Sequence, residues 1–253
     1  MCGICGVVGA DGAIAENRVC TMMDALIRRG PDDKGMLTRP GVVLGVRRLS
    51  IIDLAGGRQP IYNETGEVGV VFNGEIYNFP HLRSRLEERG HRFHTRSDTE
   101  VIVHAYEEWG ARCVDHFQGM FALALWDGRK VGAHAGKNGR VFLARDPLGI
   151  KPLYYGIAAG ALFFASEVRA LLASDAFERR LSHQGVEAYL LFGSVVEPTT
   201  MVEGVYSLPA GHFLSVKVDA PASAEPVAYW EPSPIASQVA HVPTTFASAA
   251  REV

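Results

Sequence analysis

Apolar residues are distributed along this chain in short runs, and most of these runs are typical of buried β-strands. β-Branched and aromatic residues dominate the runs, and glycine, proline or asparagine interrupts them. We therefore predict strands over residues 1–9, 41–46, 68–72, 120–126, 141–144, 153–155, 162–165 and 213–218.

Helices are predicted for five segments from their apolar spacing and their end signals. The segments are 16–29, 81–89, 97–109, 167–172 and 182–192. The third begins with a capping box, in which Ser97 is the N-cap and Glu100 lies three residues later. Because the strands and helices do not alternate regularly, we predict an α+β fold with two stacked sheets flanked by helices.

Three segments are predicted to be turns or loops. Asn73-Gly74 follows the strand over 68–72 and is typical of a sharp turn. The four glycines between Gly128 and Gly139 indicate a hairpin loop. From Pro221 onward, proline, alanine, serine and threonine dominate without strong periodicity, which indicates a linker.

Composition is that of an ordinary globular protein. The 253 residues are 47% apolar and 21% charged, with a net charge of -3. The chain has no long basic run and no apolar run of membrane-spanning length, so we expect neither nucleic-acid binding nor a membrane segment. It also lacks a secretory signal. Four irregularly spaced cysteines fit free thiols in a reducing compartment, which indicates a cytoplasmic protein.

The N-terminus carries the first candidate chemistry. Cys2 directly follows Met1, so removal of Met1 would place a thiol and a free α-amine on one residue. An α-amine has a reference pKa of about 7.7–8.0 and can accept the thiol proton near neutral pH. Cys2 could thus be an activated nucleophile with its own base. On this observation alone, a buried structural cysteine is an equally good interpretation.

A metal or redox role for Cys2 and Cys5 is the other alternative at this terminus. A zinc site normally needs four ligands, and Cys20 and Cys113 are isolated. The nine histidines are scattered, and the pair at His91 and His94 is typical of a surface or strand segment. We therefore expect no metal site.

Three further loops offer groups that suit attack on a carboxamide. The Asn73 side-chain amide and the Gly74 backbone N–H could stabilise the oxyanion of a tetrahedral intermediate. If the substrate is an α-amino acid, Arg48 could bind its carboxylate, and Glu75 and Asp98 its ammonium. Each residue also has an ordinary interpretation: a solvated arginine, a hairpin turn, a surface glutamate, or an aspartate favoured by a helix dipole.

Six ordered motifs together resemble the glutamine amidotransferase domain of glutamine-hydrolysing asparagine synthetases, over about residues 2–215. The Asn-Gly-Glu-Ile-Tyr-Asn motif favours this branch over the related sugar-phosphate and phosphoribosyl amidotransferases. The motifs are Met1-Cys2-Gly-Ile, Arg29-Gly-Pro-Asp32, Arg48-Leu-Ser-Ile-Ile-Asp53, Asn73-Gly-Glu-Ile-Tyr-Asn78, Ser97-Asp-Thr-Glu100 and Arg145-Asp-Pro-Leu-Gly-Ile-Lys-Pro-Leu-Tyr-Tyr155.

The resemblance implies an N-terminal-nucleophile hydrolase fold, a four-layer αββα sandwich, and hydrolysis of L-glutamine through a glutamyl thioester. It implies that no cofactor binds this chain, and that ATP and Mg²⁺ serve only a synthetase domain acting in cis or in trans. It also implies site roles. Cys2 is the nucleophile, and Asn73 with Gly74 forms the oxyanion hole; the substrate-binding residues are Arg48, Leu49, Ile51, Glu75 and Asp98.

The chain departs from the family pattern at two places. Arg28 stands where the family has a histidine, and no pyrophosphate loop follows the linker. We expect residues 2–218 to form the amidotransferase domain and residues 219–253 to be a linker and the start of a missing synthetase domain. Open alternatives are an acceptor other than aspartate, a non-catalytic scaffold, and an amidase for another amide. The oligomeric state is also open, with a homodimer as one option.

Overall fold

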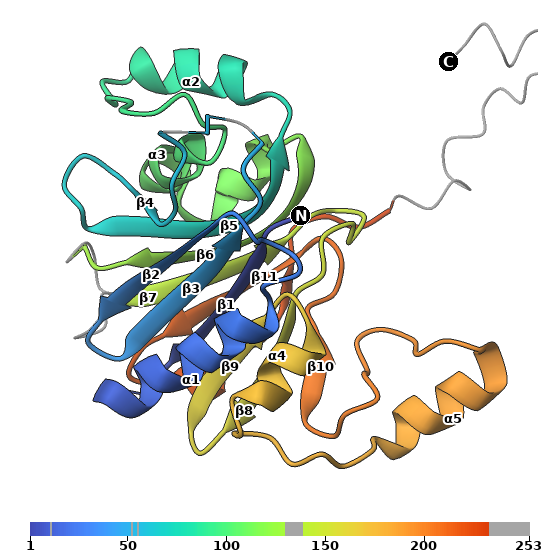
Figure 1. Cartoon of the computed structure of the whole chain (residues 1–253). Helices are drawn as coiled ribbons and strands as arrows, with labels where there is room; N and C mark the ends of the chain where they lie inside the picture. The colour runs from blue at the N-terminus through green and yellow to red at the C-terminus, as the bar shows by residue number, and fades with distance from the viewer. Residues whose placement is uncertain (11, 52, 55, 130–138, 233–253) are drawn as a thin grey trace, which may run out of the picture.

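Two six-stranded antiparallel sheets lie face to face in this computed structural model, which describes residues 1–10, 12–51, 53–54, 56–129 and 139–232 (Figure 1). The first sheet has the order β10-β8-β9-β1-β3-β2, with bounds Val205–Ser207, Tyr154–Ala158, Ala161–Ala165, Gly3–Val8, Val42–Arg48 and Asp33–Arg39. The second has the order β12-β11-β7-β6-β5-β4, with bounds Val227–Ala228, His212–Lys217, Arg140–Arg145, Gly119–Asp127, Val68–Ile76 and Ile61–Tyr62.

Helices cover the outer faces of both sheets (Figure 1). α1 (Gly12–Ala25) and α4 (Val168–Ala173) pack on the first sheet, and α2 (Phe79–Glu87) and α3 (Glu100–Trp109) on the second. α5 (His183–Phe192) projects from the sandwich and exposes Leu190, Leu191 and Phe192. The predicted αββα sandwich is therefore confirmed.

Three apolar clusters separate the four layers. Along β1, Ile4 and Val8 point into the core between the sheets, while Cys5 and Val7 point into the core beneath α1 and α4. A third core, between the second sheet and α2 and α3, contains Phe72. A strand buried on both faces needs apolar residues at every position. This is why the first strand is a continuous apolar run rather than an alternating one.

The predicted turn at Asn73-Gly74 is wrong. Both residues lie inside β5, where Asn73 pairs with Ala122 and Gly74 with Phe121 of β6. A Cβ at Gly74 would lie 2.3 Å from the carbonyl oxygen of Met120, so glycine is needed for close approach of the two strands. Sheet pairing over the full length of β5 outweighs the local turn preference of the dipeptide.

The predicted capping box at α3 is wrong. Ser97 Oγ accepts the N–H of Thr99 at 3.2 Å rather than that of Glu100, and the N-cap of the helix is Thr99, whose side chain makes no capping bond. The Glu100 carboxylate instead accepts the N–H groups of His94 and Thr95, each at 2.7 Å. The helix begins at Glu100, three residues after the predicted N-cap.

The folded unit extends beyond the predicted boundary at residue 218. A short 3-10 helix, η2 (Pro221–Ser223), packs on the domain, and β12 pairs with β11 through Phe213 and Val227. The Tyr229 hydroxyl donates a 2.7 Å hydrogen bond to the Arg145 carbonyl oxygen. Residues 221–230 are thus part of the sandwich rather than a linker.

Other predictions differ from the structure at element ends, or fall outside the part that it describes. The helix predicted over 16–29 is α1, which begins at Gly12 and ends at Ala25. The structure also contains elements that the apolar pattern did not predict, namely β2, β4, β10, β12 and the 3-10 helix η1 (Gly110–His116). Most of the loop predicted between Gly128 and Gly139, and the tail from residue 233, lie outside the described residues.

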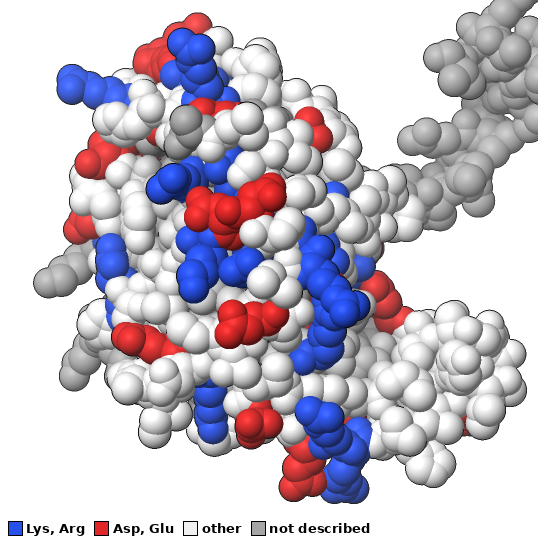
Figure 2. Space-filling model, in the orientation of Figure 1, with Lys and Arg blue, Asp and Glu red and all other residues white. Residues whose placement is uncertain are grey.

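Acidic and basic side chains are mixed on the face of the molecule shown in Figure 2. They form small neighbouring groups of opposite sign. Among the described residues, no helix combines the length and apolar character needed to cross a bilayer.

Candidate active site

One pocket, with a volume of about 150 Å³, lies where β1, β3, β5 and the segment before α3 meet. All eight residues that the sequence analysis selected line it. They are Cys2, Arg48, Leu49, Ile51, Asn73, Gly74, Glu75 and Asp98. The fold therefore gathers side chains that are almost a hundred positions apart in the sequence.

The Cys2 thiol is held at the start of β1 by contacts on both sides. Its Sγ lies 3.7 Å from the carbonyl oxygen of Leu49. Arg29 Nε donates a 2.9 Å hydrogen bond to the Cys2 carbonyl oxygen, and the Ile4 N–H donates one of 3.0 Å to Ser166 Oγ. Cys2 is partly exposed, so its thiol is accessible while its backbone is fixed.

The Arg-Gly-Pro-Asp segment joins this terminus to the loop after β3. Arg47 Nε donates to the Gly30 carbonyl oxygen at 3.0 Å, and the Ser50 N–H donates to Asp32 Oδ2 at 2.9 Å. A Cβ at Gly30 would lie 2.2 Å from the Arg47 backbone, which explains the glycine. Arg28, the departure from the family pattern, is exposed.

Arg48 forms one side of the pocket at the end of β3. It is 5% exposed, and its guanidinium donates to the carbonyl oxygens of Asp53 and Leu54 at 2.9 and 3.3 Å. The Asp53 carboxylate in turn accepts the N–H groups of Arg96 and Gly56, each at 2.9 Å. These two bonds hold the pKa of Asp53 below its ordinary value. Asp53 thus fixes the loop that orients Arg48.

Asn73 lies on the pocket wall with an unpaired donor. Its side chain is 1% exposed, and its amide nitrogen has no hydrogen-bond partner in the structure. An unpaired buried donor costs about 1–3 kcal/mol. An anionic or carbonyl oxygen in the pocket would remove that cost, and the next residue, Gly74, lines the same pocket.

Two carboxylates, those of Glu75 and Asp98, also line the pocket. Asp98 is 5% exposed, and its Oδ2 accepts the Ile76 N–H at 3.0 Å, which joins the segment before α3 to β5. Burial raises the pKa of Asp98, and the negative charge of Glu75 raises it further. The charge of Glu75 thus makes ionisation of Asp98 more costly, and a cation such as a substrate ammonium group would offset that cost.

Comparison with known proteins shows the family of this chain. A family model described as a glutamine amidotransferase domain matches residues 1–230. The chain belongs to this family. The resemblance seen in the six motifs is thereby confirmed.

The relatives of this amidotransferase domain include asparagine synthetases. The chain is 36% identical over 224 residues to "Asparagine synthetase [glutamine-hydrolyzing] 3" of Bacillus subtilis (strain 168), covering 87% of this chain and 35% of the relative. It is 43% identical over 185 residues to "Asparagine synthetase [glutamine-hydrolyzing] 2" of Oryza sativa subsp. japonica, covering 72% and 29%. The chain thus spans about a third of these relatives.

Solved structures with the same fold include a glutamine phosphoribosylpyrophosphate amidotransferase from B. subtilis. Its TM-score is 0.64 at 16% identity, covering 91% of this chain and 50% of that chain. A structure described as the allosteric regulatory enzyme of purine biosynthesis gives 0.66 at 17% identity, covering 91% and 49%. At 16% and 17% identity, the similarity to these two structures shows the fold alone.

Cys5 of the amidotransferase domain lies away from the pocket. It is fully buried in the core beneath α1, where its Sγ contacts the Val19 carbonyl oxygen at 4.0 Å. Burial raises the pKa of its thiol. Cys2 lines the pocket whereas Cys5 faces this core, so the two thiols lie in different surroundings.

The structure adds pocket residues that sequence reasoning did not select. Gln59 Oε1 accepts the Phe72 N–H at 2.7 Å and so supports the wall next to Asn73. Lys151 lies in the pocket with its Nζ 3.2 Å from Met1 Sδ. Lys151 could have been selected from the sequence, because it lies within the motif that runs from residue 145 to 155. Gln59 had no such signal, because it belongs to none of the six motifs.

Proposed function

We propose that this domain hydrolyses L-glutamine to glutamate and ammonia, with Cys2 as the nucleophile. One observation carries the proposal: a partly exposed thiol shares a pocket with an unpaired buried amide donor, an arginine and a pair of carboxylates. These groups match the carboxamide, α-carboxylate and α-ammonium of glutamine.

Met1 lines the pocket, and its removal must precede the first reaction cycle. The free α-amine of Cys2 then takes the proton of the Cys2 thiol. The thiolate attacks the side-chain carboxamide carbon of glutamine and forms a C–S bond. The carbonyl oxygen becomes an oxyanion, which the Asn73 amide and the Gly74 backbone N–H stabilise.

Collapse of this intermediate breaks the C–N bond. The ammonium form of the Cys2 amine protonates the departing nitrogen, and ammonia leaves a γ-glutamyl thioester on Cys2. Water, deprotonated by the same amine, then attacks the thioester carbonyl carbon. Glutamate is released and the Cys2 thiol is restored.

Charge complementarity selects glutamine over simpler amides. Arg48 binds the α-carboxylate, and Glu75 with Asp98 binds the α-ammonium. Backbone groups of Leu49 and Ile51 complete the pocket. A charge-assisted contact is worth about 1.5–3 kcal/mol, and butyramide lacks both the α-carboxylate and the α-ammonium, so we expect it to react far more slowly than glutamine.

Ammonia release from glutamine tests the proposal. Cys2→Ala abolishes release, whereas Cys20→Ala, which removes an exposed thiol on α1, leaves it unchanged. Intact-mass measurement shows loss of Met1, and a glutamine-analogue electrophile adds to Cys2 alone. If the folded wild-type domain releases no ammonia and takes no label on Cys2, the domain is a non-catalytic scaffold and the proposal is wrong.

The wider reaction is inferred from the relatives. Their printed names describe glutamine-hydrolysing asparagine synthetases, so we infer that the ammonia serves ATP-dependent amidation of aspartate by a synthetase domain, in cis or in trans. ATP and Mg²⁺ would bind that domain. A reduced Cys2 thiol suits the cytoplasm, where we place the reaction. Assay of aspartate against other acceptors, with the synthetase domain present, tests the choice of acceptor.

A further inference from the structure

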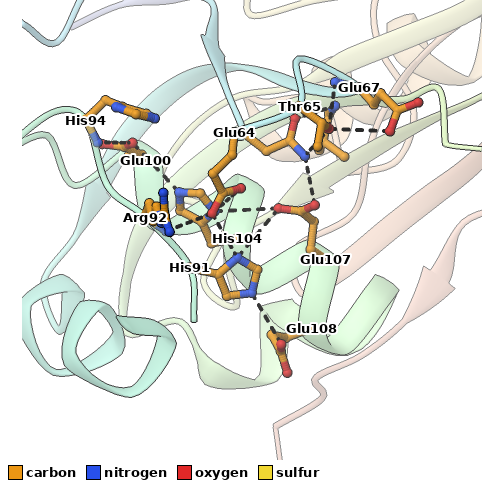
Figure 3. A network of polar contacts seen from close by, with 12 residues as sticks. Glu64, Thr65, Glu67, His91, Arg92, His94, Glu100, His104, Glu107 and Glu108 are labelled. Atoms are coloured by element: carbon orange, nitrogen blue, oxygen red, sulfur yellow. Dashed lines mark hydrogen bonds and ion pairs between the residues drawn. The ribbon is translucent and has the colours of Figure 1, made fainter. Parts of the chain in front are cut away.

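Four side chains with metal-binding atoms converge on the side of α3, outside the glutamine pocket (Figure 3). His104 and Glu107 lie one turn apart on α3, His91 lies in the segment between α2 and α3, and Glu64 lies in the turn between β4 and β5. One ligand atom from each lies within 4.8 Å of the other three. Three separate segments therefore contribute to one cluster.

The distances within the cluster are too long for good hydrogen bonds. His104 Nδ1 lies 3.5 Å from carboxylate oxygens of both Glu64 and Glu107. His91 Nδ1 lies 3.5 Å from Glu64 and 3.8 Å from Glu107. Zinc bonds of about 2.0–2.2 Å to nitrogen and oxygen place tetrahedral ligand atoms about 3.3–3.6 Å apart. Three of the four distances lie in this range, and His91 Nδ1 to Glu107 at 3.8 Å is slightly longer, although His104 and His91 face different oxygens of Glu64. The cluster is therefore close to the size of a zinc site, and a small shift of Glu64 would complete it.

Unpaired polar atoms point into the cluster. His104 is fully buried, and neither of its ring nitrogens has a hydrogen-bond partner in the structure. Glu107 Oε2 is also buried and without a hydrogen bond, while its Oε1 accepts a 2.7 Å bond from Asn63 Nδ2. Buried polar groups are normally paired, and a cation in the cluster would satisfy His104 Nδ1 and Glu107 Oε2.

We propose that this cluster binds one Zn²⁺ as a structural ion, with Glu64, His91, His104 and Glu107 as its ligands. Two imidazoles favour a transition metal over Mg²⁺ or Ca²⁺, which prefer oxygen ligands throughout. Four protein ligands leave no open position, which is typical of a structural zinc site rather than a catalytic one.

The surroundings of the two histidines support the proposal. Histidines that bind zinc commonly place their second ring nitrogen against a carboxylate. His91 Nε2 lies 3.3 Å from Glu108 Oε1, and His104 Nε2 lies 3.7 Å from Glu100 Oε1. The Nδ1 atoms therefore face the cluster, and each Nε2 faces an outer carboxylate.

The ion would fasten the segment between α2 and α3 to the second sheet. Glu100 accepts the backbone N–H groups of His94 and Thr95 and also faces His104. Asp98, which lines the glutamine pocket, lies in the same segment, two residues before Glu100. The proposal does not depend on glutamine hydrolysis.

Zinc binding to the untagged full chain tests the proposal. The protein is stripped with EDTA, and Zn²⁺ affinity is measured by competition with a chromogenic chelator. We expect one Zn²⁺ per chain, a higher melting temperature with Zn²⁺, and an X-ray absorption spectrum of nitrogen and oxygen ligands only. Sulfur in that spectrum would overturn the proposal, because it would place the ion on Cys2 or Cys20.

Paired variants locate the site without disturbing the core. Glu64 is exposed, so Glu64→Gln keeps the fold, and the nearby exposed Glu67→Gln is its control. His91→Ala is compared with His94→Ala, because His94 lies apart from the four proposed ligands (Figure 3). Loss of an outer carboxylate typically costs about 10–100-fold in affinity, and we expect loss of a ligand to cost at least as much.

Two results would contradict the assignment. Equal zinc affinity in Glu64→Gln and Glu67→Gln would place the ion elsewhere. Less than one Zn²⁺ per folded wild-type chain at saturating metal would mean that the cluster is an ion-pair network around a protonated His104. Neither result would affect the glutaminase test, since that test reads ammonia release from Cys2.

Discussion

Arg29 Nε donates a 2.9 Å hydrogen bond to the carbonyl oxygen of Cys2. The same guanidinium forms an ion pair with Glu167, with Nη1 and Oε1 3.3 Å apart. The segment after α1 therefore fixes the residue that bears the proposed nucleophile, although Arg29 does not line the pocket. This contact gives the Arg-Gly-Pro-Asp motif a positioning role.

We predict that Arg29→Met lowers kcat for glutamine hydrolysis on the order of 10²-fold, with a smaller change in KM. Displacing a reacting group by about 1 Å can cost that much, while Arg48, Glu75 and Asp98 still bind the substrate. Steady-state kinetics separate the two constants. Arg112→Met, at an exposed arginine on η1, is the control. A change confined to KM would contradict the positioning role.

Asn73→Ala should lower kcat by about 10²–10³-fold, the usual cost of removing one oxyanion-hole donor. Its amide nitrogen is unpaired without substrate, so its removal leaves no broken bond in the resting domain. We therefore expect little loss of stability in thermal unfolding. Asn17→Ala, on the surface of α1, should change neither quantity. Full activity of Asn73→Ala would exclude the residue from the oxyanion hole.

Glutamine binding should weaken in mild acid because of Asp98. Burial, with a contribution from the Glu75 charge, raises the pKa of Asp98. The carboxyl group must be ionised to bind the substrate ammonium. KM should therefore rise as pH falls, beginning at a higher pH than an ordinary aspartate would set. In Glu75→Gln, the onset should move to lower pH, though burial keeps it above the ordinary value. If KM began to rise at the same pH in Glu75→Gln as in wild type, the pH dependence would belong to a group other than Asp98.

Asp98→Asn should have opposite effects on stability and binding. A carboxyl group with a raised folded-state pKa contributes stability in its neutral form, and that contribution is lost as pH rises through the folded pKa. The neutral amide avoids this loss, so denaturation at pH 7 without ligand should show a domain at least as stable as wild type. Loss of a charge-assisted contact should raise KM by about 10–100-fold. If Asp98→Asn were less stable than wild type at pH 7, ionisation of Asp98 would not destabilise the folded domain, which would contradict this prediction.

The four thiols should differ in reactivity. Cys2 is partly exposed and Cys20 exposed, whereas Cys5 and Cys113 are fully buried, which raises their thiol pKa. Iodoacetamide at pH 8 should label the first two in the native domain and all four after denaturation. Peptide mass spectrometry measures each site. Glutamine should protect Cys2 but not Cys20, and protection of both would place the substrate elsewhere.

Several features of the pocket were already visible in the sequence. Cys2, Arg48, Glu75 and Asp98 each lie in a short motif, and the family model matches the part of the chain that contains all of these motifs. Continuous apolar runs also predicted most of the strands. Such a run reports burial on both faces, which is a local property of the chain.

The Asn73-Gly74 dipeptide shows where local reasoning failed. In isolation it favours a hairpin turn, yet nine residues of β5 pair with β6 and include both positions. Cross-strand pairing is long-range information, and a propensity for a turn does not contain it. The role inferred for the two residues did not depend on the turn, since it rested on their donors.

The sequence by itself determined the family, the four-layer fold and the residues around one pocket, because these depend on apolar pattern and ordered motifs. Only the tertiary structure brought His91 and His104 to Glu64 and Glu107, where their spacing supports the proposed zinc site. Scattered histidines carry no spacing signal along the chain. Their meeting depends on how α3 packs against two loops, and that packing is fixed by the core rather than by any motif.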